Sequence, residues 1–298
     1  MTRWSAIIGS PVAHSLSPVL HGAAWASVGL GQDEGGPWRF DCLEQTKETL
    51  PALLAGLDAD CLGLSVTMPC KQAVIPLLDT VEPLATAVGA VNTVVPSGGL
   101  LSGFNTDVYG IVASLTEARA RAGLTERPRS AVVLGSRATA SSALAALAQM
   151  RVGDITMIAR RFSGAGSASI AATRLGVEVE QVLLQRDDLV HEALERADVF
   201  ISTVPAGAAD GLAATLRPRP DQTLLDVVYA PRDTGPVRAY EAAGAVIAEG
   251  ADMLLHQAVQ QVVLETGRQP DVEAMRTAMW AELDRRTSAS TSRTAAGA

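Results

Sequence analysis

Short apolar runs alternate with segments of helical periodicity along most of the chain. In its first third we expect strands at 5–9, 38–42, 61–66 and 90–96, and helices around 18–29, 45–56 and 71–78. Strands that alternate with helices along a sequence are typical of α/β proteins with mostly parallel sheets. The pattern therefore predicts an α/β fold for this part of the chain.

The same alternation returns after a polar segment at 124–130. Before that segment, Asn105, Thr106 and Asp107 lead into a predicted helix that ends near Gly123. Beyond it we expect strands near 131–134, 154–159, 177–182, 198–202, 223–228 and 245–248, and helices that start near 138, 167, 187 and 235. After Gly250, the spacing of apolar residues in MLLHQAVQQVVLETG predicts one more helix.

Two domains with a boundary close to residue 106 account for this repetition. We expect an α/β substrate domain made of 1–106 and 250–285, a Rossmann-like domain made of 107–249, and a cleft between them. The tail, 286–298, consists largely of small and polar residues, so we expect it to be disordered. A chain of 298 residues is long enough to give both domains a core.

Charge and composition exclude several classes of function. The net charge of −8 and the lack of a long Lys/Arg run argue against binding to nucleic-acid phosphates. No apolar run approaches the length of a membrane span, and Met1 leads into an apolar strand without a signal-peptide pattern. We therefore expect a globular protein with neither a nucleic-acid partner nor a membrane partner.

The three cysteines, Cys42, Cys61 and Cys70, are odd in number and lack C-x-x-C spacing. Together with four scattered histidines they predict neither a disulfide framework nor a metal site. We expect reduced thiols, a cytoplasmic location and no bound metal. A homodimer is compatible with the sequence.

A candidate cofactor site lies in AVVLGSRATASSALAAL, residues 131–147. An apolar run ends at Gly135 and an alanine-rich helical segment follows, as in strand–turn–helix units that bind a dinucleotide pyrophosphate at the helix N-terminus. The expected G-x-G-x-x-G/A is represented by Gly135, Arg137 and Ala140. An arginine therefore stands where the backbone should come closest to the phosphates.

Arg137 and Ala138 each bring a Cβ to a turn in which glycine can adopt positive φ. A strained left-handed placement would cost about 1–3 kcal/mol, whereas a guanidinium near the pyrophosphate would gain about 1.5–3 kcal/mol. The two effects are similar in size. Two interpretations therefore stand: Arg137 binds the pyrophosphate, or the turn has lost the cofactor.

Polar side chains follow other predicted strands. Ser15 and Ser17 lie after the first strand, where α/β sheets bind ligands, although Ser17 before Pro18 also suits a helix cap. In LSVTMPCK, Thr67 follows a strand and Lys71 opens the next helix; an isolated lysine is more often a solvated surface charge. The ends of these strands are therefore candidate ligand sites.

Two further polar residues have both a structural and a functional interpretation. Asn92 lies within an apolar run, so its amide must find hydrogen-bond partners in the fold or in a ligand. Asp107 at a helix start is either a first-turn acid at the positive end of the helix dipole or a partner for the Lys71 ammonium.

Together and in this order, the segments resemble the shikimate dehydrogenase family over residues 7–270. The family signature G-x-P-x-x-H-S-x-S-P…H is matched by Gly9, Pro11, His14, Ser15, Ser17, Pro18 and His21. The remaining matches are SVTMPCK, A-V-N-T at 90–93, N-T-D at 105–107, and GADMLLHQA with Gly250, Met253 and Gln257.

The resemblance implies NADP-dependent reversible reduction of 3-dehydroshikimate to shikimate in aromatic amino-acid biosynthesis, with Lys71 as general acid/base and Asp107 as its partner. It implies that the substrate's carboxylate and hydroxyls contact Ser15, Ser17, Thr67, Lys71, Asn92, Asp107, Tyr229 and Gln257. It implies cofactor contacts from Gly135, Ser136, Arg137, Ala138, Thr139, Arg160, Arg161, Thr203, Val228, Gly250 and Met253.

The sequence favours NADP over NAD. An NAD site places an acid about 20 residues beyond the glycine turn, on the ribose 2′-hydroxyl. Here the strand ends in TMIARR, which offers Arg160 and Arg161 and no acid, and cations suit a 2′-phosphate.

Two alternatives remain beside this interpretation. The first is a quinate or shikimate dehydrogenase that uses NAD. The second is a non-catalytic paralogue with a shikimate-type pocket, supported by Arg137-Ala138 and opposed by the presence of both Lys71 and Asp107. Gly22 and Ser65 also depart from the family, which usually has asparagine at both positions, and RDTGPV replaces a common Thr-Pro-Leu.

Overall fold

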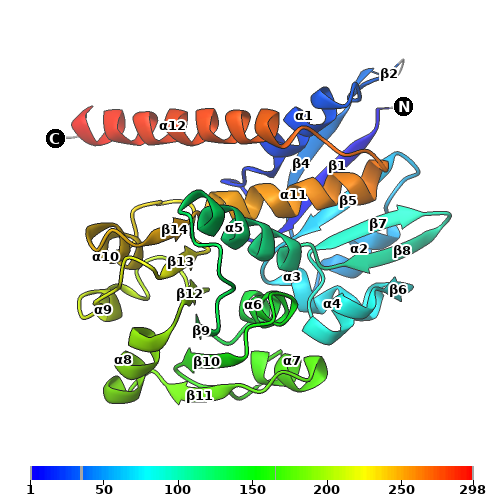
Figure 1. Ribbon diagram of the computed structural model, residues 1–298. Helices are drawn as coiled ribbons and strands as arrows, with labels where there is room; N and C mark the ends of the chain where they lie inside the picture. The colour runs from blue at the N-terminus through cyan, green and yellow to red at the C-terminus, as the bar shows by residue number, and fades with distance from the viewer. Residues whose placement is uncertain (1, 34–35, 165, 297–298) are drawn as a thin grey trace. The chain divides into compact units, whose positions relative to one another are not determined.

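The computed structural model describes residues 2–33, 36–164 and 166–296, and it confirms the α/β fold (Figure 1). Its chain divides into two compact units. Unit 1 comprises the residues up to Val81, then Val91–Phe104, and those from Ala258 onward. Unit 2 comprises Glu82–Ala90 and Asn105–Gln257.

Unit 1 contains a six-stranded mixed sheet in the order β4-β1-β5-β7-β8-β6. The strands are β1 (Trp4–Gly9), β4 (Arg39–Glu44), β5 (Cys61–Val66), β6 (Thr80–Val81), β7 (Thr93–Ser97) and β8 (Leu100–Phe104). β1 pairs in parallel with β4 and β5, whereas β7 runs antiparallel to β5 and β8. All residues of β1 and β5 are buried, which explains their continuous apolar sequences.

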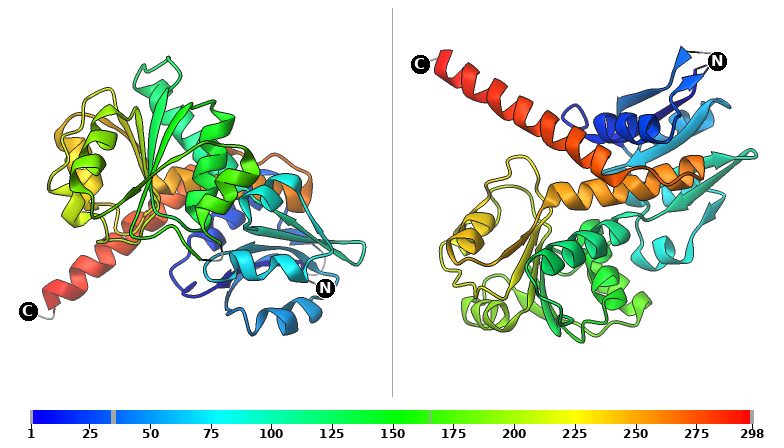
Figure 2. Two further views of the ribbon diagram at one scale, coloured as in Figure 1. Left: turned by 90° about the horizontal axis from the view of Figure 1, so that it is seen from below. Right: turned by 45° about the horizontal axis from the view of Figure 1, so that its top comes forward.

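The other elements of unit 1 are mostly helical. They are α1 (Ser17–Ser27), α2 (Leu50–Ala55), α3 (Cys70–Ala73), the 3₁₀ helix η1 (Ile75–Leu77), α12 (Val272–Ala296), and a hairpin of β2 (Gln32–Asp33) and β3 (Gly36–Pro37). α12 packs beside α1 (Figures 1 and 2). The structure differs here from the expected disordered tail at 286–298, because α12 continues to Ala296. The segment contains no glycine or proline before Gly297 to end the helix.

Unit 2 contains a six-stranded, wholly parallel sheet in the order β11-β10-β9-β12-β13-β14. The strands are β9 (Ser130–Leu134), β10 (Asp154–Ala159), β11 (Glu180–Leu183), β12 (Val199–Ser202), β13 (Thr223–Asp226) and β14 (Val246–Ala248). In chain order within the unit this arrangement is 3-2-1-4-5-6, the strand order of the Rossmann fold. The order reverses beside β9, which is where such folds bind dinucleotides.

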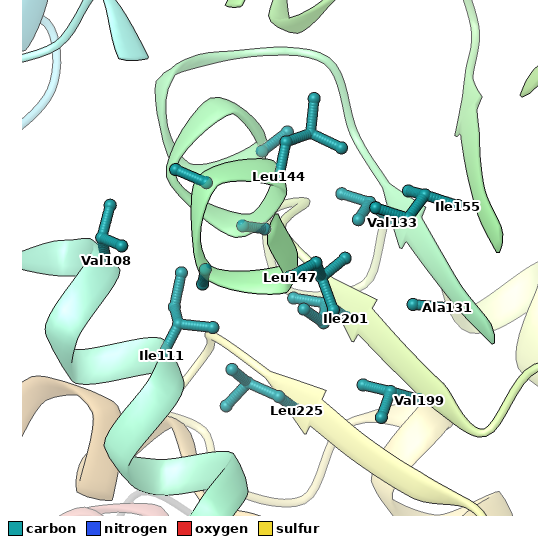
Figure 3. Close-up of a cluster of buried hydrophobic side chains, with 14 of the residues drawn as sticks. Val108, Ile111, Ala131, Val133, Leu144, Leu147, Ile155, Val199, Ile201 and Leu225 are labelled. Atoms are coloured by element: carbon teal, nitrogen blue, oxygen red, sulfur yellow. The ribbon is translucent and has the colours of Figure 1, made fainter. Parts of the chain in front are cut away.

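Helices cover both faces of this sheet (Figure 2, left). They are α4 (Pro83–Val88), α5 (Asp107–Arg121), α6 (Ala138–Gln149), α7 (Ala168–Leu175), α8 (Asp187–Arg196), α9 (Asp210–Ala213), α10 (Gly235–Ala242) and the first part of α11 (Gly250–Thr266). Alternate residues of β9 serve the two cores: Val133 packs with α5, α6 and α7, and Val132 packs with α8, α9 and α10. Figure 3 shows the first of these cores, with Ile111 and Leu147 beside Leu225.

The division between the units differs in two places from the expected domain boundaries. The segment Glu82–Ala90 belongs to unit 2, because α4 packs against α6 and α7. The first residues of α11 also belong to unit 2, because Gly250 lies directly against the backbone of Asp226–Val228.

Most expected elements are present, with β5 and β10 at the expected bounds. The helix expected at 45–56 begins only at Leu50, since hydrogen bonds between Thr46 and Thr49 close a turn before it. The sequence pattern did not predict β8, which forms a hairpin with β7 through a turn at Gly98 and Gly99, with φ of +60° and +81°.

Candidate functional site

The predicted substrate residues of unit 1 gather at one edge of its sheet. β1 and β5 run in parallel, so their carboxyl ends meet at this edge, and the antiparallel β7 begins there. Ser15 and Ser17 follow β1, Thr67 follows β5, and Asn92 comes directly before β7. The topology thus brings together residues that are more than seventy positions apart in the chain.

Backbone hydrogen bonds join the loops at this edge. The Ser10 amide donates to the Met68 carbonyl at 2.8 Å, and the Val66 amide donates to the Asn92 carbonyl at 2.7 Å. The Val91 amide donates to the Lys71 carbonyl at 2.8 Å. These bonds fix the positions of the loops from which the candidate side chains extend.

Gly9 allows the β1 loop to approach the β5 loop. It has φ of +148°, and a Cβ on it would lie 2.5 Å from Thr67 Cγ2 and 2.6 Å from the Met68 carbonyl oxygen. Only glycine fits this position without displacing neighbouring backbone. The glycine of the family signature therefore has a steric role beside Thr67.

Ser17 does not cap its helix through its side chain. α1 begins at Ser17 with Leu16 as its N-cap and no side-chain cap hydrogen bond, so the capping interpretation was wrong. Instead, the Ser17 amide donates to Ser15 Oγ at 3.1 Å. Both serine side chains are largely buried in the loop that starts α1.

Gln261 of α11 organises the surroundings of Asn92. Its Nε2 donates to the Asn92 carbonyl at 3.2 Å and to Thr93 Oγ1 at 3.1 Å, and its Oε1 accepts from Ser65 Oγ at 2.9 Å. Thr93 Oγ1 in turn donates to Asn92 Oδ1 at 3.0 Å. The fold therefore supplies partners for Asn92, and Ser65, where the family usually has asparagine, belongs to this buried network.

In unit 2, Asp107 and Gln257 lie on the neighbouring helices α5 and α11. Asp107 is the first residue of α5, at the positive end of the helix dipole, and its side chain is buried. Gln257 Oε1 accepts from Thr106 Oγ1 at 3.4 Å. A Cβ on Gly110 would lie 2.6 Å from the Met253 carbonyl oxygen, so this glycine permits the close approach of α5 and α11.

The remaining predicted contacts of unit 2 lie near the ends of β13 and β14. Tyr229 is half-buried in the segment that follows β13. A Cβ on Gly250 would lie 2.9 Å from the Val228 carbonyl oxygen, so these two residues are neighbours. Met253 is a buried member of the core formed with α5 and α6.

The turn that connects β9 to α6 requires glycine at its first position. Gly135 has φ of +122°, and a Cβ on it would lie 2.2 Å from Thr203 Oγ1. Thr203 Oγ1 donates to the Leu134 carbonyl at 2.8 Å, and the Ser136 hydroxyl donates to the Arg161 carbonyl at 3.1 Å. The turn is thus joined to the ends of both neighbouring strands, β10 and β12.

Arg137 and Ala138 are not strained. Arg137 is the N-cap residue of α6, with φ of −114° and ψ of −163°, and Ala138 is the first residue of that helix. Both conformations are open to any L-amino acid. The strain considered from the sequence is therefore absent, and Arg137 is an exposed residue.

A cavity of about 1010 Å³ lies beside this turn. Of the predicted cofactor residues, its lining includes Gly135, Ser136, Arg137, Arg160, Arg161 and Thr203. Ala138, Thr139, Val228, Gly250 and Met253 are not among its lining residues. Three arginines thus line part of one cavity, and their positive charge there contrasts with the net negative charge of the chain.

Several residues of this cavity carry no signal in the sequence. Asp187, Val190, His191, Leu212 and Thr215, from α8 and from the segment around α9, line its far side. The hydrogen bond between His191 Nε2 and Thr215 Oγ1, at 2.7 Å, joins the two segments. Only the tertiary packing of α8 against the α9 segment brings these residues to the cavity.

Within the described ranges, no three His, Cys, Asp or Glu side chains are grouped closely enough to hold a metal ion. Among the helices that the structure describes, none combines the length and the apolar character needed to cross a membrane.

The fold and the glycine turn define an α/β protein of the dinucleotide-binding class, with a second unit that carries polar side chains at one sheet edge. The family model for the shikimate dehydrogenase substrate binding domain matches residues 7–94. A shikimate dehydrogenase (NADP(+)) of Moorella thermoacetica is 34% identical over 275 residues, which cover 91% of this chain and 90% of that protein. The chain belongs to the shikimate dehydrogenase family.

Solved structures agree with this assignment. Mycobacterium tuberculosis shikimate dehydrogenase is 35% identical and superposes with a TM-score of 0.79, covering 94% of this chain and 99% of that chain. The Thermus thermophilus enzyme in complex with NADP(H) and shikimate is 28% identical, with a TM-score of 0.76 and coverage of 94% and 99%.

A quinate dehydrogenase is as similar to this chain as the Thermus thermophilus enzyme is. Quinate dehydrogenase from Corynebacterium glutamicum, in complex with NAD, is 28% identical with a TM-score of 0.76, and the match covers 94% of this chain and 99% of that chain. Overall similarity therefore establishes the family, and the choice of substrate and cofactor depends on individual side chains.

Proposed function

We propose that the protein catalyses the NADP-dependent, reversible reduction of 3-dehydroshikimate to shikimate in aromatic amino-acid biosynthesis. The observation that carries the proposal is family membership over nearly the whole chain, with relatives named shikimate dehydrogenase (NADP(+)). The proposal includes a cytoplasmic location, supported by the free cysteines, and a homodimer as the assembly to test first.

The residues of unit 2 fit a dinucleotide that bears a 2′-phosphate. A Cβ would fill the turn at Gly135, and the exposed guanidinium groups of Arg160 and Arg161 follow the strand next to it. In this strand order, the end of β10 is where the adenosine ribose of a dinucleotide is recognised. When bound, the nicotinamide would supply or accept the hydride.

In unit 1 the hydroxyl and amide groups at the sheet edge suit a small polyol acid. Serine and threonine hydroxyls both donate and accept hydrogen bonds, and a carboxylate accepts them. We assign Ser15 and Ser17 to the carboxylate, because they lie side by side in one loop, and Thr67 and Asn92 to ring hydroxyls. Tyr229 and Gln257 complete the proposed substrate set from unit 2.

Lys71 would move the proton. Reduction of a ketone leaves an alkoxide that must be protonated as it forms, and an ammonium group can do this without a metal. The hydrogen bond from the Val91 amide to the Lys71 carbonyl fixes the backbone from which this side chain extends. Asp107 is the proposed carboxylate partner, which would hold the ammonium in place.

The experiment that tests the proposal is a direct assay of purified protein. Shikimate with NADP, shikimate with NAD, and quinate with each cofactor are compared by the absorbance of the reduced nicotinamide. We expect the highest kcat/KM with shikimate and NADP. A preference for quinate with NAD would instead establish the alternative, a quinate dehydrogenase that uses NAD.

The unstrained backbone of Arg137 argues against the alternative of a paralogue that has lost the cofactor. That alternative was based on Arg137 and Ala138, and both residues occupy ordinary conformations. It predicts that shikimate raises the melting temperature while NADP does not, so a thermal shift with each ligand separates the two cases.

A further inference from the structure

The C-terminal helix contacts the loop that carries the proposed carboxylate-binding serines. Arg286 of α12 donates from Nη1 to the His14 carbonyl at 2.6 Å and from Nη2 to the Ser15 carbonyl at 3.1 Å. One guanidinium therefore binds two consecutive carbonyls of the same loop. Such a two-point contact fixes the orientation of the peptide as well as its position.

Glu282, one turn earlier in α12, holds the guanidinium in place. Its Oε1 accepts from Arg286 Nε at 2.6 Å, and both its carboxylate oxygens accept from Arg285. These two arginines lower the pKa of Glu282 to about 2. The carboxylate therefore stays ionised at neutral pH. The Arg286 guanidinium is held by Glu282 through Nε and by the two loop carbonyls through Nη1 and Nη2.

α12 is also fixed at its beginning, to the far end of α1. The Asp271 amide donates to Ser27 Oγ at 3.0 Å, and Arg268 Nη1 donates to the Val28 carbonyl at 2.8 Å. Asp271 Oδ1 caps α12 by accepting from the amides of Glu273 and Ala274. α12 therefore runs along α1 in the opposite direction and reaches the Ser15 loop with Arg286 (Figures 1 and 2).

The opposite side of the loop is held by the sheet. The Val12 amide donates to Glu44 Oε1 at 2.9 Å, and the Ser10 amide donates to the Met68 carbonyl. Within the loop, the Ser15 amide donates to the Val12 carbonyl at 3.0 Å. The His14–Ser15 peptide is therefore held by this turn on its amide side and by Arg286 on its carbonyl side. With Ser15 Oγ accepting from the Ser17 amide, the Ser15 hydroxyl can donate its own hydrogen to a carboxylate.

We infer that Arg286 is a positioning residue for the substrate loop, and that the C-terminal helix sets the affinity for the carboxylate of the substrate by fixing the Ser15 hydroxyl. The inference rests on the proposed function for the identity of that carboxylate. Preorganisation of this kind lowers the entropy lost when the ligand binds. Its loss should therefore weaken substrate binding and leave the proton transfer and cofactor binding unchanged.

The experiment compares Arg286→Gln and Arg286→Lys with the full-length protein. For Arg286→Gln we expect the KM for shikimate to rise about tenfold, with kcat and the KM for NADP within about twofold of the starting values. Arg286→Lys keeps one charged donor and should recover part of the loss. Arg285→Gln is the matched control, because the Arg285 guanidinium also binds Glu282 but directs its hydrogen bonds to that carboxylate and not to the loop.

Hydrogen exchange of the 10–17 segment gives a second measurement that does not depend on turnover. The Ser15 and Ser17 amides should exchange faster in Arg286→Gln than in Arg285→Gln. A lower melting temperature with unchanged KM and unchanged exchange would overturn the inference. If the unmodified protein does not turn over shikimate, the proposed function fails, and the exchange of the loop amides still decides the role of Arg286.

Discussion

His21 Nε2 and Glu265 Oε1 lie 3.8 Å apart, and both side chains are fully shielded from solvent. His21 also contacts the rings of Trp25 and Phe40, while Glu265 Oε2 accepts from Ser5 Oγ at 3.1 Å. A Cβ on Gly63 would lie 2.6 Å from Glu265 Oε1, so the glycine leaves room for the carboxyl group in its present position. These polar groups of α1 and α11 thus face each other in the interior of unit 1 without a hydrogen bond between them.

The first prediction is that this pair makes stability fall at alkaline pH. Burial lowers the pKa of His21 from 6.5 to about 4 and raises the pKa of Glu265 from 4.5 to about 8. The nearby Cys61 thiol, whose pKa is raised to about 12, stays neutral in this range. Near pH 7 the folded pair thus holds close to one proton on Glu265, whereas in the unfolded chain Glu265 is ionised and His21 holds only about a quarter of a proton.

The direction in which each pKa is shifted decides how the stability of the protein changes with pH. Glu265 loses its contribution to stability as the pH rises from 4.5 towards 8, and His21 loses its contribution as the pH falls from 6.5 towards 4. Between pH 4.5 and 6.5, the two groups change the free energy of unfolding in opposite directions as the pH rises. Above pH 6.5, only Glu265 still changes it. We expect a loss of about 1–2 kcal/mol between pH 6.5 and 8.

Urea denaturation at several pH values measures this effect. Glu265→Gln should remove the decline above pH 6.5, whereas Glu126→Gln, at an exposed ion pair, should keep it. A decline of equal slope in Glu265→Gln and the unmodified protein would show that other groups cause it.

The second prediction concerns Gly135. Its φ is +122°, and a Cβ at this position would lie only 2.2 Å from Thr203 Oγ1, which leaves no room for alanine. Gly135→Ala should lower the free energy of unfolding by about 1–3 kcal/mol and weaken NADP binding. Gly153→Ala is the control, because a Cβ there has no neighbour within 4 Å and the residue has no positive φ. Equal stability of both variants by urea denaturation would contradict the steric argument.

The gathering of Ser15, Thr67 and Asn92 could be predicted because it follows from topology. Each residue adjoins an apolar strand, and once the strands pair, their ends must meet. The strands themselves were predictable because buried strands are continuous apolar runs with abrupt ends. The β5 strand, Cys61–Val66, has the expected bounds for this reason.

The contacts of Arg286 and Glu265 could not be predicted in the same way. Each depends on the exact placement of a C-terminal helix against residues more than 240 positions earlier. The local sequence around Arg286 is rich in small polar residues, which indicated disorder, and the packing of α12 on α1 overrides that preference. The unstrained conformation of Arg137 likewise depends on its place as the cap of α6.

The third prediction is that Arg137 strengthens cofactor binding. Its backbone is relaxed, and its Nη1 lies 3.7 Å from the position of a Cβ on Gly164, in the segment that follows Arg160 and Arg161. Arg137→Gln should weaken NADP binding about tenfold with little change in shikimate binding. Fluorescence titration of the reduced cofactor measures the Kd.

Binding of NAD, which lacks the 2′-phosphate, shows whether Arg137 contacts the 2′-phosphate or the pyrophosphate. If the guanidinium binds the 2′-phosphate, Arg137→Gln should leave NAD binding unchanged; if it binds the pyrophosphate, both cofactors should weaken equally. Arg127→Gln, an exposed arginine outside the cavity lining, is the charge-matched control. An unchanged Kd for both cofactors would mean that Arg137 points into solvent.

The last prediction concerns proton transfer by Lys71. General acid–base catalysis by a positioned side chain contributes about 10²- to 10⁴-fold to a rate. Lys71→Ala should therefore lower kcat by about that factor while shikimate binding, measured by calorimetry, changes much less. Lys47 and Lys71 are the lysines of the chain, and Lys47 is exposed on a turn before α2, which makes Lys47→Ala the matched control.

A further variant separates proton transfer from substrate positioning. If Asp107 holds the ammonium, Asp107→Asn should lower kcat, and Lys71→Ala combined with Asp107→Asn should cost little more than Lys71→Ala alone. Equal losses of kcat and shikimate affinity in Lys71→Ala would assign Lys71 to binding rather than to acid–base chemistry. Additive losses in the double variant would mean that Lys71 and Asp107 act independently, because a carboxylate that works only through the ammonium has no effect once the ammonium is gone.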